Sequence, residues 1–146
     1  MKLALLCLLV SLLSACVMDP LDRTNPINNA IYHYRVGNYD RAREIYDELW
    51  NSGERSSWVS EHLGYIYENG LGNTAVSKEK AFELYSSGAD RGYQFSMLGL
   101  YRLYKEDGND QMADYWLDLL ARQNNQEAIA ILQREARPIP TPDLAN

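Results

Sequence analysis

The sequence predicts an all-α fold, a short right-handed α-α solenoid of about three helical hairpins closed by a C-terminal capping helix. Three observations support this prediction. One largely apolar pattern occurs three times, with the spacing of residues on a single helix face. The copies are separated by distances that are typical of repeat proteins. Glycine and asparagine stand between the apolar stretches, where helices commonly end and begin.

Each copy of the pattern begins with an alanine and continues at offsets of 3, 4, 7, 8 and 11 residues. The first residue is Ala42 in the first copy, Ala81 in the second and Ala113 in the third, so the copies stand 39 and 32 residues apart. Most of these positions are apolar, and such offsets lie on one side of an α-helix. Each copy therefore predicts one helix that packs against neighbouring units.

The pattern and the breaks between its copies predict a series of paired helices. Asn25 is a typical N-cap, and Gly37 can close the first helix in the left-handed conformation. Asn124 is expected to cap the final helix. The expected helices cover about 26–36 and 39–52 in unit one, 57–69 and 77–91 in unit two, 93–105 and 109–123 in unit three, and 125–137 at the end.

The first residues have the pattern of a bacterial export signal. Lys2 precedes an apolar run over residues 3–13, which is too short to cross a membrane as a helix. The run ends in Leu-Ser-Ala-Cys at 13–16, which resembles the lipobox of bacterial lipoproteins. The resemblance implies cleavage before Cys16 and attachment of lipid to its sulfur, so that acyl chains anchor the protein to a membrane. The alternative is a soluble periplasmic protein with an unmodified cysteine.

Val17, rather than aspartate, follows this cysteine. By the same resemblance, valine favours the periplasmic face of the outer membrane, with inner-membrane anchoring as the alternative. The predicted organisation is a signal peptide over 1–15, a lipidated tether over 16–24, a repeat domain over 25–137 and a disordered, proline-rich tail over 138–146.

Composition and charge argue against several kinds of function. The formal net charge is −6 and the isoelectric point is near 4.9, which disfavours binding to nucleic acid. The only cysteines, Cys7 and Cys16, precede the predicted repeat domain, so no disulfide framework is expected there. His33 and His62 lack the neighbouring ligands that a metal site needs, and no phosphate-binding or nucleophile motif is present. We therefore expect no metal, no cofactor and no enzymatic activity.

Unit two contains the most specific pattern of the chain. Its ordered residues are Leu63-Gly64, Tyr67, Gly70-x-Gly72, Lys80-Ala81, Leu84-Tyr85, Ala89 and Gly92. This set resembles a Sel-one-like repeat, a branch of the tetratricopeptide superfamily with a longer, glycine-containing loop. Leu98-Gly99 repeats Leu63-Gly64 35 residues later. Because they have no side chain, Gly64 and Gly99 are expected to let their helices approach Ala81 and Ala113 closely.

In tetratricopeptide-like folds, the first helices of the hairpins line a concave groove that binds partners. The resemblance therefore implies a partner-binding groove formed by Tyr32, Arg35, Glu61, Tyr65 and Glu68. The helical period assigns Tyr34, Leu63 and Tyr67 to the core, which leaves two tyrosines for the groove. The alternative is that some of these side chains pack between units. Glu61 and Glu68 lie seven residues apart, so we expect a solvated acidic stripe rather than a catalytic pair.

These features predict a non-enzymatic, lipid-anchored scaffold or adaptor in the bacterial cell envelope, which holds envelope proteins in its groove. Secretion or polysaccharide-export assembly is the expected setting, by analogy with similar lipoproteins. The alternative from another class is a regulator that recruits a peptidoglycan enzyme to the membrane. An enzyme in its own right is disfavoured because no catalytic set of residues is apparent.

Overall fold

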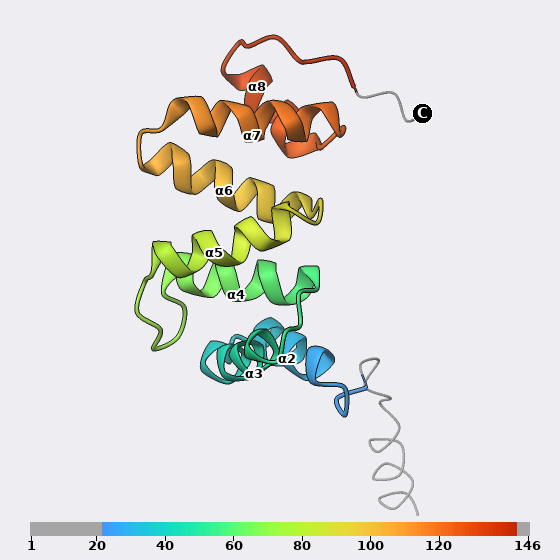
Figure 1. The fold of residues 1–146 in the computed structure, drawn as a ribbon, viewed down its shortest axis with the longest axis vertical. Coiled ribbons are helices and arrows are strands. Elements are labelled where there is room, and N and C mark those ends of the chain that lie inside the picture. Colours follow the sequence, from blue (N-terminus) through green and yellow to red (C-terminus); the bar gives the residue numbers. More distant parts are fainter. Residues whose placement is uncertain (1–21, 143–146) are drawn as a thin grey trace, which may run out of the picture.

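The computed structural model describes residues 22–142, and all regular secondary structure in this range is helical (Figure 1). The helices are α2 (Pro26–Arg35), α3 (Tyr39–Asn51), α4 (Ser57–Asn69), α5 (Lys78–Ala89), α6 (Gln94–Glu106), α7 (Asp110–Arg122) and α8 (Gln126–Arg134). Helices α2–α3, α4–α5 and α6–α7 form three hairpins that follow one another along the long axis, and α8 packs on α7. The predicted all-α fold of three hairpins and a closing helix is confirmed.

Most helices begin at the polar residues that the sequence indicates. The Asn25 side chain accepts a hydrogen bond from the Ile27 amide at 2.9 Å, and Asn109 accepts one from the Met112 amide at 3.2 Å. These bonds satisfy amide groups that have no partner within the helix. Gly37 has a φ of +78°, as expected for a residue that closes a helix.

The start of α8 differs from the prediction by one residue. Asn125, rather than Asn124, caps the helix and accepts a hydrogen bond from the Ala128 amide at 3.0 Å. Asn124 instead ends the turn after α7 with a φ of +60°, which asparagine tolerates better than most residues. The helix ends at Arg134 rather than near residue 137, because the chain turns at Ala136, where φ is +53°.

The buried centre of units two and three is built around Tyr85 of α5. A Cβ atom added at Gly64 of α4 would lie 2.6 Å from Cε1 of this ring, and one added at Gly99 of α6 would lie 2.5 Å from Cδ2. The close approach expected at the two glycines therefore occurs, but against a tyrosine ring rather than against Ala81 and Ala113. One aromatic side chain fills the space between the first helices of two successive units.

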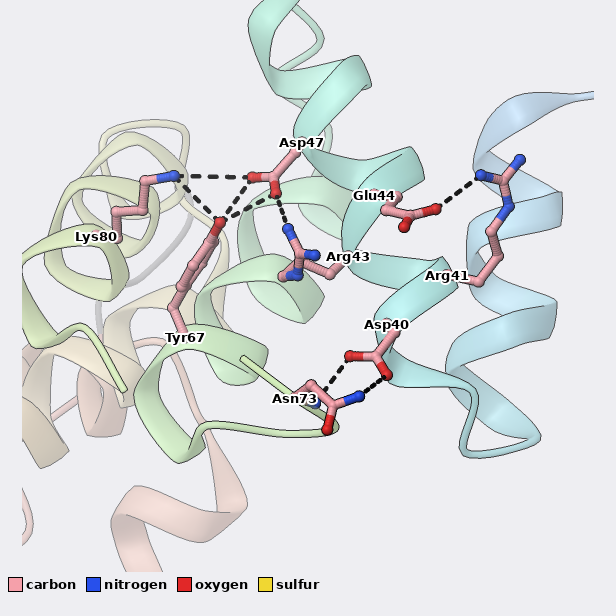
Figure 2. Close-up of polar contacts among 8 residues, drawn as sticks. All are labelled: Asp40, Arg41, Arg43, Glu44, Asp47, Tyr67, Asn73 and Lys80. Carbon is pink, nitrogen blue, oxygen red and sulfur yellow. Dashed lines mark hydrogen bonds and ion pairs between the residues drawn. The ribbon is translucent and has the colours of Figure 1, made fainter. Parts of the chain in front are cut away.

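A polar cluster joins units one and two (Figure 2). The Tyr67 hydroxyl lies 3.0 Å from both carboxylate oxygens of Asp47, and Arg43 donates to Oδ2 of the same carboxylate at 3.0 Å. Lys80 reaches the Tyr67 hydroxyl oxygen from α5 at 3.1 Å. The cluster connects α3, α4 and α5 through one carboxylate.

The glycine-containing loop of unit two contacts the start of α3 (Figure 2). The two carboxylate oxygens of Asp40 accept hydrogen bonds from the backbone and side-chain nitrogens of Asn73, each at 2.8 Å. A Cβ atom at Gly72 would lie 2.7 Å from Oδ1 of Asp40, so only glycine fits closely there. The longer loop is thus held against the preceding hairpin.

The predicted signal peptide and Cys16 lie outside the described residues, as do residues 143–146. In the described part of the chain, no helix combines the length and the apolarity that crossing a membrane requires. Residues 138–142 form neither helix nor strand, in keeping with their prolines.

Candidate functional site

The first helices of the hairpins and α8 line a cavity of about 500 Å³. Tyr85 of α5 also contributes to its wall, and the remaining side chains come from α2, α4, α6 and α8. The lining residues are Tyr34, Trp58, Glu61, His62, Tyr65, Tyr85, Phe95, Leu98, Arg102 and Glu127. A volume of this size lies in the range of about 300–1,000 Å³ that is typical of ligand sites.

A second cavity of about 300 Å³ lies between α6 and α8. It shares Leu98, Arg102 and Glu127 with the first cavity. The two cavities therefore adjoin at these side chains, and we call them together the groove. It is lined by residues from every unit of the stack, as a concave binding surface of a repeat protein would be.

Three large aromatic side chains are exposed in the groove. The exposed fraction is 44% for Trp58, 41% for Tyr65 and 67% for Phe95. Single exposed apolar residues are common, but several that line one depression indicate an interaction surface. Aromatic side chains are also the residues that contribute most often to protein binding energy.

Glu61 is a half-buried carboxylate among these apolar groups. Among the described residues, none makes a hydrogen bond or an ion pair with its side chain. Burial without a partner disfavours the charged form and raises the pKa of Glu61 to about 7. Near neutral pH, this carboxyl group can therefore gain or lose a proton.

Glu68, on the same helix, has a different environment. Its side chain is only 7% exposed, and the Arg102 guanidinium donates to its two oxygens at 2.9 and 2.8 Å. The Tyr85 hydroxyl donates to the same carboxylate at 2.7 Å. The expected solvated acidic stripe is therefore wrong: Glu68 joins α4 to α6, and Glu61 lies half-buried in the groove.

The end of the groove nearest α2 contains a histidine surrounded by aromatic rings. The His62 ring centre lies 4.3 Å from that of Tyr34 and 5.4 Å from that of Trp58. Its Nδ1 lies 3.0 Å from the Trp58 carbonyl oxygen and 3.2 Å from the Tyr46 hydroxyl. Because a carbonyl only accepts, Nδ1 carries the hydrogen of the neutral ring. Burial lowers the pKa of His62, so the neutral form is favoured.

The predicted groove residues do not all lie in the groove. Glu61 and Tyr65 line it, whereas Tyr32 and Arg35 are absent from its walls. The Tyr32 ring packs instead beneath the Arg23 guanidinium, 4.0 Å from the ring centre. Tyr34, which the helical period assigns to the core, takes the place in the groove that Tyr32 was expected to have. The role of these residues in partner binding remains a prediction.

Several groove residues were not predicted from the sequence. Trp58, Glu61 and Tyr65 are spaced by three and four residues on one helix, so the helical period could have indicated Trp58. Phe95 and Glu127 belong to later helices, and no comparable spacing connects them to this face. Only the packing of α6 and α8 brings them beside α4.

The polar cluster that joins units one and two offers no space for a substrate. The cavity beside Asp47, Tyr67 and Lys80 has a volume of about 10 Å³, which is close to the minimum for one water molecule. Within residues 22–142, no three side chains of histidine, cysteine, aspartate or glutamate are placed to hold a metal ion together.

Comparisons of the chain with protein-family models, with curated proteins and with solved structures find no match. The resemblance to Sel-one-like repeats therefore rests on the residues named above and remains a prediction.

Proposed function

We propose that the protein is a non-enzymatic, lipid-anchored adaptor of the bacterial cell envelope, which binds a partner protein in the groove. The observation that supports binding is the exposure of Trp58, Tyr65 and Phe95 in one cavity. The apolar run and the Leu-Ser-Ala-Cys sequence at 13–16 support the anchor. The outer membrane is the proposed location, with the chain on its periplasmic face.

The groove is better suited to a protein than to a reaction. Its charged and titratable groups include the partnerless Glu61, an arginine already paired with Glu68 and an enclosed histidine in the first cavity. The remaining ones are Glu127, Arg134 and Glu135. No described residue pair there combines a nucleophile with a base within hydrogen-bonding distance in an open site. Large apolar contacts with few polar groups provide affinity for a partner surface.

Photo-crosslinking in cells tests the proposal. A photoreactive phenylalanine analogue at Phe95 should crosslink the full, lipidated chain to an envelope protein, which mass spectrometry then identifies. The same analogue at Phe82, an aromatic residue that is 39% exposed outside the groove, is the control position. Equal crosslinking from both positions, or none from Phe95, would contradict binding in the groove.

The anchor requires a separate experiment. Cys16→Ser should abolish incorporation of labelled palmitate and release the protein from the membrane fraction. Retention of the variant in the outer-membrane fraction would contradict lipid anchoring without affecting the conclusion about the groove. A partner identified as an export component would support the adaptor setting, whereas a peptidoglycan enzyme would support the regulatory one.

A further inference from the structure

The groove combines exposed aromatic side chains with carboxylates that have no partner. Glu61 from α4 and Glu127 from α8 both line the first cavity, and neither makes an ion pair with another described residue. The cation in that cavity, Arg102, is already neutralised by Glu68. The first cavity therefore contains two carboxyl groups for which the described residues provide no compensating cation.

A partly buried carboxylate without a partner is costly, and a cation from outside would relieve that cost. The neighbouring rings favour the same kind of ligand. Trp58 and Tyr65 have exposed aromatic surface, which attracts ammonium and guanidinium groups through its negative face. The apolar stem of lysine or arginine can also pack along such rings.

The shape of the groove indicates a chain segment rather than a small cation. The two cavities share Leu98, Arg102 and Glu127, so together their lining runs from the aromatic residues of α4 to Ile131 and Arg134 of α8. Phe95, which is 67% exposed, provides an apolar contact beside the charged position. The second cavity adds Arg134 and Glu135, whose opposite charges leave its lining without the excess of carboxylates found in the first.

We propose that the groove binds a segment of the partner protein in which a lysine or arginine lies beside an apolar side chain. The basic group pairs with Glu61 against Trp58 and Tyr65, and the apolar side chain packs on Phe95. The proposal rests on the proposed function of the groove and specifies the chemistry of its partner.

Selection from a library of random twelve-residue peptides displayed on phage tests this proposal, with the full mature chain in detergent as the target. Peptides that bind should be enriched in lysine or arginine next to an apolar residue. The best peptide then becomes the probe in titrations followed by fluorescence anisotropy. Glu61→Gln should weaken its binding about tenfold, as expected for loss of a hydrogen-bonded charge pair.

Two matched changes identify the contact. Glu48 is an exposed glutamate on α3 outside the groove, so Glu48→Gln should leave affinity unchanged. Replacing the basic residue of the peptide with norleucine retains an apolar stem and removes the charge. The loss of affinity caused by this replacement should be much smaller in Glu61→Gln than in wild type, because the effects of changing two groups that contact each other do not add.

The outcomes separate this proposal from the proposed function. The assignment of a basic segment is overturned if the selected peptides are acidic or purely apolar. It is also overturned if Glu61→Gln leaves the affinity unchanged. In either case, loss of peptide binding in Phe95→Ala would still support binding in the groove. Peptides that bind wild type and Phe95→Ala equally contradict both. A further outcome is that no peptide is selected and sedimentation shows a dimer that Phe95→Ala dissociates. The occupant of the groove would then be a second copy of this chain, which also overturns the proposal.

Discussion

Glu61 and Glu68 show how environment separates two identical side chains on one helix. Glu68 accepts hydrogen bonds from Arg102 and Tyr85, so its charge is compensated inside the protein. Glu61 is half-buried among groups that offer no such bond, and burial raises its pKa to about 7. The Glu68 carboxylate therefore stabilises the stack, whereas the Glu61 carboxylate lowers its stability.

This cost predicts a pH dependence. Because the folded state holds the Glu61 proton more tightly than the unfolded chain, stability should fall as pH rises from about 4.5 to 7. Glu61→Gln removes this decline. At pH 8 the variant should be more stable than wild type by about 1 kcal/mol, a value reduced because the carboxylate is partly solvated. Urea unfolding at pH 4.5 and pH 8 measures the difference.

The neighbouring His62 has the opposite dependence and is present in both proteins. Burial lowers its pKa, so its contribution is lost as pH falls below the unfolded value of about 6.5. The difference between wild type and Glu61→Gln cancels this effect. A difference that does not change with pH would contradict the environment described for Glu61.

At the scale of the helices, glycine determines how α4, α5 and α6 fit together. Gly64 and Gly99 leave space for the Tyr85 ring, and Gly88 of α5 faces Ser60 and Ser96 of the two flanking helices. A Cβ atom at Gly88 would overlap the Ser96 hydroxyl. The glycines of α4 and α6 thus make room for the Tyr85 ring of α5, and Gly88 of α5 makes room for the serine side chains of α4 and α6.

Gly64→Ala should therefore destabilise the protein by about 1–3 kcal/mol through overpacking against Tyr85. The sign is informative because alanine otherwise stabilises a helix relative to glycine by about 1 kcal/mol. In the Tyr85→Leu background, the cost of Gly64→Ala should become smaller. Thermal and urea unfolding of wild type, the two single variants and the double variant give the coupling energy. A stabilising effect of Gly64→Ala would show that the helices are not in close contact.

The helices themselves were predictable because their apolar period and their caps are local properties of the sequence. Which side chains face the groove was not. Successive residues on a helix point about 100° apart, so Tyr32 and Tyr34 lie on nearly opposite sides of α2. Which of these sides faces the groove depends on how α2 packs on α4, and the local pattern does not determine that packing. Matching positions in the first helices of units one and two are 33 residues apart, whereas those in the second helices are 39 residues apart. The extra residues form the loop that Asp40 holds, and no single repeat register describes both helices.

At the scale of the whole molecule, stability comes from contacts between successive hairpins, and the last hairpin depends on α8. Leu132 and Ala128 of this helix have no exposed surface. Each unit of a linear stack buries its faces only against its neighbours, so damage at one end should remain largely at that end.

Leu132→Ala should cost about 2–5 kcal/mol, because it leaves a cavity beneath the closing helix. Hydrogen exchange should show the largest loss of protection in α7 and α8, and the smallest in α2 and α3. Ile139→Ala is the matched control, since this side chain is 46% exposed and its loss should cost less than about 0.5 kcal/mol. Uniform loss of protection in Leu132→Ala would mean that the chain unfolds as a single cooperative unit.

The position of Tyr85 has a consequence for motion inside the stack. Gly64 lies along the Cδ1–Cε1 edge of the ring and Gly99 along the Cδ2–Cε2 edge, so a half-turn about the Cβ–Cγ bond must displace packed backbone. The two edges are then inequivalent in nuclear magnetic resonance spectra, and they exchange only when α4 and α6 move apart. The rate of this ring flip reports how often neighbouring hairpins separate while the protein remains folded.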